Sequence, residues 1–382
     1  MDISYSMLGI IAIVLLICIG ISFTVNQYLL KNASSFGKNK GGEQVRWASA
    51  AKPPVGGMSF YVVLILAVLG LLFSFSDIVS WSFVSLFVGV TLPVTVGFFV
   101  GLADDSYNTS PLIKFIGQFS CAGLFILAGV VIPISDNNIL NYWFTILWVV
   151  GMMNSINMLD NMDGIVSSVS LVALALALMI IFSSKSQNLT DIILITAVIG
   201  ALIGFLFFNW NPAKIYMGDT GSQFLGAFLS WVSIQYFWQF RDFEEGGIQV
   251  KQFLIPALAF IIPLIDTVTV TLRRLARGVS PFVGGRDHTT HHLAYLGIKD
   301  KNVVRIMIAI AIISALVAFN ILPVLKSSEW HWSFSLATII YYLTVFFGLQ
   351  YFYEVAKQKI NQPKQEERKE MVRVEGYDEV LN

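Results

Sequence analysis

The feature that most constrains this chain is its series of long apolar runs. Runs such as Met7–Leu30, Met58–Phe75 and Val303–Leu325 each supply close to the ~20 apolar residues that a helix needs to cross a ~30 Å hydrocarbon core. Only 13% of the residues are charged, against about 25% in an ordinary soluble domain. Such runs are expected as spans at 7–30, 58–76, 81–101, 113–133, 139–157, 164–183, 190–209, 218–240, 252–275, 302–324 and 333–355. The sequence therefore predicts an all-α polytopic membrane protein with about eleven transmembrane helices.

The distribution of basic residues predicts how these helices are oriented. With the N-terminus outside, twenty of the 24 Lys and Arg residues fall in the cytoplasmic loops, in the four span residues next to such a loop, or in the C-terminal tail, as the positive-inside rule requires. We expect an integral membrane catalytic domain over 1–356 and a charged, solvated or partly disordered cytoplasmic tail over 357–382. The formal net charge is zero, which gives no indication of nucleic-acid binding. Cys18 and Cys121 lie alone in apolar runs and are expected to be buried without a disulfide or metal.

The first polar cluster follows the third predicted span. It contains the adjacent carboxylates Asp104 and Asp105, then Asn108 and Lys114. Paired carboxylates suit Mg²⁺, which prefers oxygen ligands and binds substrate phosphates through one or two carboxylates. The alternative is an ordinary solvated helix cap.

The second cluster ends the fifth predicted span and contains Asn154, Asn157, Asp160 and Asp163, each three residues after the last. On a straight α-helix each step of three falls back by about 60°, so Asn154 and Asp163 would face opposite ways. We therefore predict that the helix ends or tightens near Met158–Asn161. The alternative is a polar network that only joins helices.

The third cluster runs from Asn209 through Lys214 to Asp219, which stands between two glycines at the start of the eighth predicted span. Exposed amides and the helix dipole favour anions at a helix N-terminus, so a carboxylate there suits phosphate and metal together. A plain N-cap is the alternative interpretation.

The fourth cluster brings basic residues together after the ninth predicted span. His288, His291 and His292 have spacings of three and four, which would place them on one face of a helix. Arg286 and the arginines before it fit phosphate recognition. A zinc site is the rival interpretation, although no cysteine accompanies the histidines.

Together these motifs resemble the polyprenyl-phosphate N-acetylhexosamine-1-phosphate transferases of glycosyltransferase family 4, over about residues 46–300. The resemblance implies Mg²⁺, with Mn²⁺ as a substitute, on Asp219 and Asp105. It implies the following catalytic residues: Asp104, Asp105, Asp219, His291 and His292. It implies the following substrate contacts: Lys52, Asn108, Lys114, Asn154, Asn157, Asp160, Asp163, Asn209, Lys214, Arg286 and His288.

This chain also departs from the family's pattern. Lys52 belongs to a Lys-Pro-Pro-Val-Gly-Gly segment that looks like a shortened form of the family's loop, and Asn161 stands where many members have Gly. The last motif has His-His-Leu instead of the triple histidine of phospho-N-acetylmuramoyl-pentapeptide transferases. This difference favours the branch that uses UDP-GlcNAc or a related UDP-HexNAc.

The reaction that the resemblance implies is transfer of GlcNAc 1-phosphate from UDP-GlcNAc to undecaprenyl phosphate, releasing UMP. This would be the first membrane step of cell-wall or lipopolysaccharide synthesis, at the cytoplasmic face of a bacterial inner membrane. Asp104 is a candidate base, a covalent phospho-aspartyl route stays open, and a homodimer is expected by analogy alone. The alternatives are a MurNAc-pentapeptide transferase, a membrane transporter, and a zinc enzyme.

Overall fold

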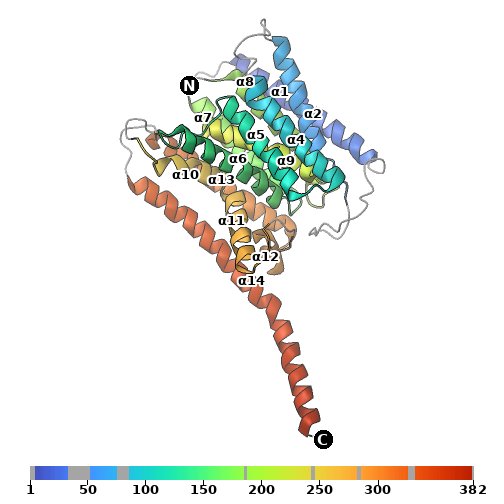
Figure 1. Cartoon of the computed structure of the whole chain (residues 1–382). Coiled ribbons are helices and arrows are strands. Elements are labelled where there is room, and N and C mark those ends of the chain that lie inside the picture. The colour runs from blue at the N-terminus through green and yellow to red at the C-terminus, as the bar shows by residue number, and fades with distance from the viewer. Residues whose placement is uncertain are drawn as a thin grey trace.

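The computed structural model describes residues 5–32, 52–74, 86–184, 187–241, 246–281, 285–325 and 332–380. These ranges form helices and contain no strand, so the all-α expectation is confirmed (Figure 1). The α-helices are α1 (Tyr5–Lys31), α2 (Gly57–Ser74), α4 (Leu92–Tyr107), α5 (Pro111–Leu127), α6 (Asn138–Leu159), α7 (Ile165–Ser183), α8 (Leu189–Asn209), α9 (Gly218–Tyr236), α10 (Lys251–Ala259), α11 (Ile261–Ala276), α12 (Thr289–Tyr295), α13 (Asp300–Leu325) and α14 (Trp332–Val380). A short π-helix, η1 (Phe87–Thr91), leads directly into α4.

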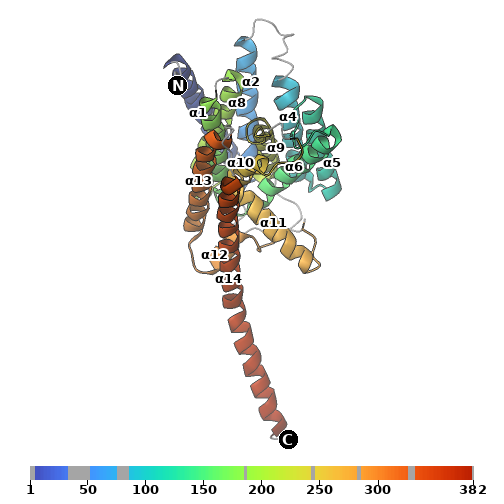
Figure 2. The ribbon, with the colours of Figure 1, turned by 90° about the vertical axis from the view of Figure 1, so that its left-hand side faces the viewer.

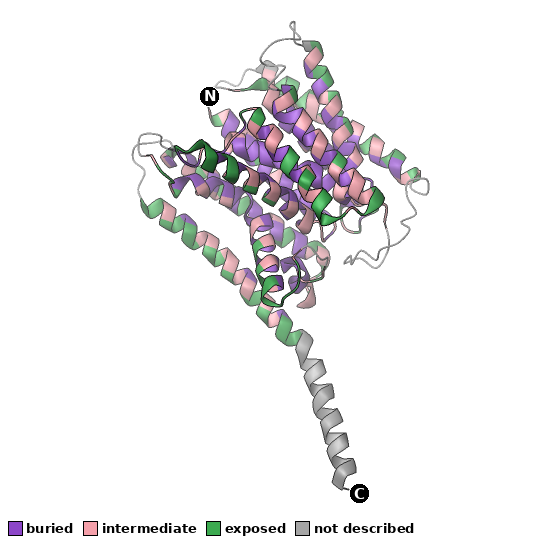
Figure 3. Ribbon diagram, in the orientation of Figure 1, coloured by how far each residue is buried: buried purple, intermediate pink, exposed green. Residues whose placement is uncertain are grey.

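The helices have the length and composition that a membrane protein requires. Within the described ranges, seven are long and apolar enough to cross a membrane, or eight if the bent pair α10 and α11 is one span. Two further apolar helices, Gly57–Phe73 and Pro111–Leu127, are shorter. Figure 3 shows buried residues gathered inside the bundle and exposed ones on its outer helices. The polytopic expectation is confirmed, whereas the number eleven and the orientation stay predictions.

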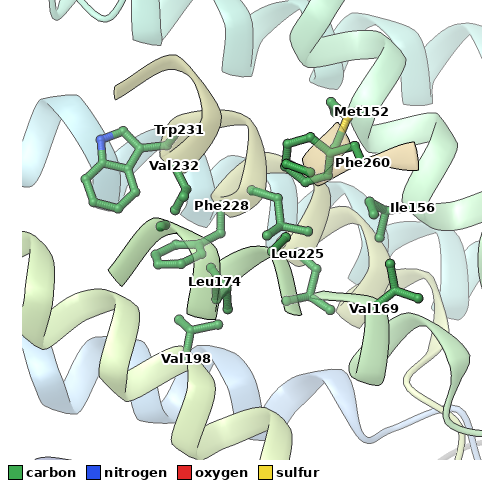
Figure 4. Packing of buried hydrophobic residues seen from close by; sticks show 14 of the residues in the cluster. Met152, Ile156, Val169, Leu174, Val198, Leu225, Phe228, Trp231, Val232 and Phe260 are labelled. Carbon is green, nitrogen blue, oxygen red and sulfur yellow. The ribbon is translucent and has the colours of Figure 1, made fainter. Parts of the chain in front are cut away.

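The centre of the bundle is α9. It packs against α2, α4, α6 and α7, and Figure 2 shows it surrounded by other helices. The buried side chains of Leu225, Phe228 and Trp231 fill the space around it (Figure 4). Buried serines and Gln223 also lie on α9. A helix enclosed by protein on all sides does not have to present a lipid-like surface, which explains why α9 is less apolar than the outer spans.

The predicted span at 252–275 is two helices. Between α10 and α11 the axis bends by 89°, and Phe260 at the break has φ −115° and ψ 30°. Pro263 falls in the first turn of α11, where a missing N–H leaves no helical hydrogen bond unmade. Hydropathy alone does not detect the break because both halves are apolar.

Other boundaries also differ from expectation. The third helix runs to Tyr107 instead of residue 101, and residues 81–85 lie outside the described ranges. The fourth helix ends at Leu127, before the left-handed Gly129, and not at residue 133. The tail, expected to be partly disordered, continues α14 as a helix to Val380. Its many Gln, Glu, Lys and Arg residues are good helix formers.

Figures 1 and 2 show α14 passing α11 and α12 and then leaving the bundle.

Both cysteines are buried and free, as predicted.

Candidate active site

The C-terminal turn of α4 is joined directly to the N-terminus of α9. Asp105 Oδ1 accepts a hydrogen bond from the backbone N–H of Asp219 at 3.0 Å. Its Oδ2 accepts from the N–H and the hydroxyl of Thr220 at 2.8 and 2.7 Å. A side chain at Gly101 would collide with the backbone of Asp219. Asp105 therefore caps α9 and fixes the place of Asp219, while its predicted role as a metal ligand remains a prediction.

Lys114 bridges two carboxylates that come from different helices. Its Nζ donates to Asp104 Oδ2 at 2.8 Å and to Asp219 Oδ2 at 2.6 Å. Asp104 also accepts a hydrogen bond from Thr109 at 2.6 Å, and Asn157 Nδ2 donates to Asp219 Oδ1 at 2.8 Å. We call Asp104, Lys114, Asn157 and Asp219 the carboxylate cluster. It unites three of the four sequence motifs.

The polar residues at the end of α6 each contact a different part of the chain. Asn154 exchanges amide hydrogen bonds with Gln118 of α5 at 2.8 and 3.2 Å, whereas Asn157 reaches α9. Asn161 accepts a hydrogen bond from the Thr290 hydroxyl of α12 at 2.7 Å. The helix ends at Leu159, which confirms the predicted end near Met158–Asn161. Because the helix stops there, one short segment links the carboxylate cluster to the histidine motif.

Asp163 connects this segment to the loop before α9. Its Oδ2 accepts hydrogen bonds from the Ala213 N–H at 2.9 Å and from Asn211 Nδ2 at 3.1 Å. Lys52 Nζ lies 3.8 Å from the same oxygen and 5.2 Å from the centre of the Tyr216 ring. The two lysine contacts place Lys52 at the candidate site.

The Lys52 segment is itself held against the loop before α9. The N–H groups of Gly56 and Gly57 donate to the carbonyls of Tyr216 and Met217, each at 3.0 Å. A side chain at Gly57 would collide with the backbone of Gly221. Gly57 is therefore required for close backbone packing, whereas a side chain at Gly56 would meet the ring of Phe205.

Asn209 is buried and fully engaged. Its Oδ1 accepts from the Gly164 N–H at 3.0 Å, and its Nδ2 donates to the Ile215 carbonyl at 2.9 Å. It is 2% exposed. The structure therefore shows Asn209 joining α7 to the loop before α9, and its predicted contact with the nucleotide sugar stays a prediction.

Four other predicted residues lie at helix ends or in loops. Asp160 is the C-cap of α6, and Asn108 is the left-handed C-cap of α4 with φ 50°. Lys214 is exposed in the loop before α9, and Arg286 is exposed shortly before α12. Their predicted roles as substrate contacts stay predictions.

The histidine motif is only partly helical. His288 has an extended backbone and is the N-cap of α12, while His291 and His292 lie on that helix and are buried. The rings of His288 and His291 are 5.3 Å apart at 86°. Asp266 on α11 binds His288 Nδ1 at 2.8 Å. Sequence analysis missed Asp266, although a single carboxylate inside an apolar run is a recognisable signal.

Arginines brace the loop before α12. Arg274 makes a two-pronged ion pair with Asp287, at 2.6 Å from Nη2 and 3.1 Å from Nε, and Arg277 adds a contact at 2.7 Å. Burial would raise the pKa of Asp287, but the two guanidinium groups outweigh it and hold that pKa well below its usual range. These arginines are thus already paired within the protein.

The two helical histidines are held in the neutral form. Burial lowers the pKa of His291 to about 4, with a further contribution from His288. Burial also lowers the pKa of His292 to about 4, and Arg273 adds to the effect. An unfolded histidine titrates near ~6.5, so between about pH 6.5 and 4 the unfolded chain binds more protons than the folded one. Folding stability is therefore fully present above about pH 6.5 and falls as the pH drops toward 4.

The fall of folding stability at acidic pH can be tested. The thermal midpoint of the wild-type protein is expected to fall between about pH 7 and 5. His291→Gln and His292→Gln proteins are expected to lose less over the same interval, because glutamine does not titrate. Thermal unfolding in detergent at several pH values measures this, with His331→Gln as the matched control outside the motif. Equal slopes for the wild type and both motif variants would contradict the burial of the two imidazoles.

The carboxylate cluster fits a divalent cation on the chemistry of its donors. Lys114 shows that a positive group is accepted between Asp104 and Asp219. Among the described residues, no three His, Cys, Asp or Glu side chains are grouped so as to hold a metal ion. Mg²⁺ does not need such a group, because it is commonly bound by one or two carboxylates together with substrate phosphates and water.

Comparison with known families shows which proteins the segment that carries this site is similar to. Residues 86–237 match the family model described as glycosyl transferase family 4. This segment of the chain is therefore similar to glycosyl transferase family 4. The matched segment runs from the start of η1 to the end of α9 and so contains the whole carboxylate cluster. The histidine motif, at residues 288–292, lies outside that segment.

Three curated relatives illustrate the family. The chain is 28% identical, over 66% of its length and 71% of the relative's, to the probable undecaprenyl-phosphate N-acetylglucosaminyl 1-phosphate transferase of Bacillus subtilis (strain 168). It is 28% identical, over 66% of its length and 67% of the relative's, to the decaprenyl-phosphate N-acetylglucosaminephosphotransferase of Mycolicibacterium smegmatis. It is 32% identical to the phospho-N-acetylmuramoyl-pentapeptide-transferase of Listeria innocua, over 50% of this chain and 64% of the relative.

Proposed function

We propose that this protein transfers N-acetylhexosamine 1-phosphate from a UDP-sugar to polyprenyl phosphate, with UMP as the other product. Similarity to this family and to the named relatives supports a phosphoglycosyl transferase that uses a polyprenyl phosphate acceptor. The observation that carries the proposal is the Lys114 ammonium held between Asp104 and Asp219, where three motifs converge. Phosphoryl transfer depends mainly on positioning and on neutralising charge, and this cluster provides both.

In this proposal each member of the carboxylate cluster has a distinct task. Asp219 holds Mg²⁺, which neutralises charge on the diphosphate when it is bound. Asn157 orients the carboxylate of Asp219 through its 2.8 Å hydrogen bond. Asp105 fixes the backbone of Asp219 by accepting a hydrogen bond from its N–H. Lys114 supplies a second positive charge, and Asp104 keeps the ammonium in place.

The incoming nucleophile is an oxygen of the lipid phosphate. It attacks the β-phosphorus of the UDP-sugar, the bond from that phosphorus to the bridging oxygen breaks, and UMP leaves with the electron pair. A phosphate monoester with a second pKa near ~6 is mostly dianionic at neutral pH, so the acceptor has little need of a base. Asp104 is therefore assigned to positioning first, and to proton removal only at low pH.

Lys52 and the histidine motif complete the proposed site. Lys52 is anchored on Asp163 at 3.8 Å with its amine near the Tyr216 ring, a position that suits contact with a negatively charged nucleotide. His291 and His292 lie on α12, which is joined to the end of α6 by the Asn161–Thr290 hydrogen bond. We assign the histidines to the donor diphosphate, and Lys52 to the nucleotide.

We further propose that the site faces the cytoplasm of a bacterial cell, because twenty of 24 basic residues fall on that side in the predicted orientation. GlcNAc is the proposed sugar, supported by the His-His-Leu ending of the last motif and by the names of two relatives. MurNAc-pentapeptide is the second candidate because the Listeria innocua relative shares 32% identity.

A donor panel tests the sugar. Detergent-purified protein with undecaprenyl phosphate and Mg²⁺ is offered UDP-GlcNAc, UDP-GalNAc or UDP-MurNAc-pentapeptide, and UMP is measured. We expect lipid-dependent UMP release with UDP-GlcNAc to exceed that with the other donors. Release with UDP-MurNAc-pentapeptide alone would overturn the choice of sugar while leaving the reaction class intact.

A further inference from the structure

Asp266 is a buried carboxylate that the proposed reaction does not use. It lies on α11, is 2% exposed, and comes from an apolar stretch of the chain. One oxygen, Oδ2, lies 2.8 Å from His288 Nδ1. The other, Oδ1, accepts a hydrogen bond from the Thr289 N–H at 2.8 Å. Both oxygens are therefore directed at the start of α12, more than twenty residues further along the chain.

These two bonds fix the helix that carries the histidine motif. Thr289 is the first residue of α12, so Asp266 supplies an N-terminal cap from a neighbouring helix. The next residue, Thr290, is bonded to Asn161 at 2.7 Å. Asn161 lies just after the end of α6. The N-terminus of α12 is therefore bonded both to α11, through Asp266, and to the segment that follows α6, through Asn161.

Asp266 itself has no room for a substrate group. The cavity that it borders, together with Thr289, Thr290 and Leu159, measures about 10 Å³, roughly the space of a single water molecule. A sugar or phosphate does not fit there. Asp266 can influence the reaction only through the groups that it holds.

His288 is the residue through which Asp266 can affect the reaction. A carboxylate that accepts from Nδ1–H fixes the tautomer and the ring orientation, and leaves Nε2 as the nitrogen available to a ligand. The His288 ring also meets the His291 ring edge to face at 5.3 Å. Orientation of one ring therefore constrains its neighbour in the motif.

We propose that Asp266 is a positioning residue for sugar-phosphate transfer, which keeps His288 protonated on Nδ1 and fixes α12 relative to the end of α6. A purely structural carboxylate would stabilise the fold without setting a tautomer. The positioning role predicts a change in the ring chemistry of His288 when the carboxylate is replaced. The kinetic part of the test rests on the proposed function, and the spectroscopic part does not.

The test uses Asp266→Asn in the full-length protein. Asparagine can keep the bond to the Thr289 N–H through its oxygen, but it turns an amide N–H toward His288 Nδ1, which favours protonation on Nε2. We expect kcat for UMP release to fall roughly 10- to 100-fold, as when other residues that orient a functional group are lost, with little change in KM for the UDP-sugar. We also expect the His288 ¹⁵Nδ1 resonance to move from the protonated to the unprotonated range, assigned by its absence from His288→Gln.

Two comparisons separate positioning from destabilisation. Asp191→Asn is the matched control, because Asp191 is also a part-buried carboxylate with a side-chain hydrogen bond, which it accepts from Tyr236. Asp191 lies in the first turn of α8, about 27 Å along that helix from Asn209. It should leave kcat and the His288 resonance unchanged. The double variant Asp266→Asn/His288→Gln should be no slower than His288→Gln alone, since both changes interrupt one path.

The outcomes are distinct. An unchanged ¹⁵Nδ1 resonance, or losses in the double variant that multiply, would overturn the proposal. If the wild type released no UMP from any donor, the proposed function would fail, while the resonance of His288 would still decide whether Asp266 sets its tautomer.

Discussion

Asp219→Ala is expected to lower kcat/KM for lipid-dependent UMP release by at least about 10²- to 10³-fold, the loss seen when a group that stabilises transition-state charge is removed. Asp219 is the meeting point of the site: Lys114 and Asn157 both bind its side chain, and Asp105 binds its backbone. Alanine removes the proposed Mg²⁺ ligand and leaves the Lys114 ammonium with one carboxylate. Initial rates with undecaprenyl phosphate and UDP-GlcNAc measure the loss.

The control for this experiment is Asp191→Ala, which removes a carboxylate at the other end of the bundle. It should retain activity close to that of the wild type. Both variants should elute as the same species in detergent, so that a loss of rate reports on the site. An Asp219→Ala protein that works as fast as the control would contradict the assignment of Asp219.

Lys114→Met is expected to have the second largest effect. The ammonium lies 2.8 and 2.6 Å from two carboxylates, and without it Asp104 and Asp219 face each other as like charges. We expect the rate at saturating Mg²⁺ to fall about 10²-fold. The Mg²⁺ concentration for half-maximal rate should fall as well, because a competing cation has been removed from the carboxylates.

Mg²⁺ titrations of UMP release measure both effects at once. Lys114→Arg keeps the positive charge and is the matched control, with a smaller loss of rate and no gain in Mg²⁺ affinity. If Lys114→Met needed more Mg²⁺ than the wild type, the ammonium would not be competing with the cation for the two carboxylates, which would contradict this part of the proposal.

Much of the site could be predicted from the sequence because its motifs are local. The steps of three residues that lead from Asn154 to Asp163 require the helix to stop if all four polar residues are to be used, and α6 does end at Leu159. The position of Asp219 at a helix N-terminus also follows from the small residues around it. What the spacing does not give is the partner of each side chain, since those partners come from α5, α9, α12 and a loop.

Other features depend on packing between distant segments. The adjacent residues Asp104 and Asp105 look equivalent in the sequence, yet one binds Lys114 and the other caps α9. Asp266 was missed because its partner, His288, is 22 residues away along the chain, at the N-cap of α12. The break at Phe260 was missed because α10 and α11 are both apolar. Only the 89° bend between their axes distinguishes the two helices from one span.

The most direct test of the central claim is to follow both products of one reaction. Purified protein is given UDP-GlcNAc, undecaprenyl phosphate and Mg²⁺, and mass spectrometry of the lipid fraction is compared with the UMP released. The account predicts undecaprenyl-diphosphate-GlcNAc and UMP in equal amounts, both absent without the lipid and both lost in Asp219→Ala. UMP without a pyrophosphate-linked lipid, or no UMP with any UDP-HexNAc, would contradict it.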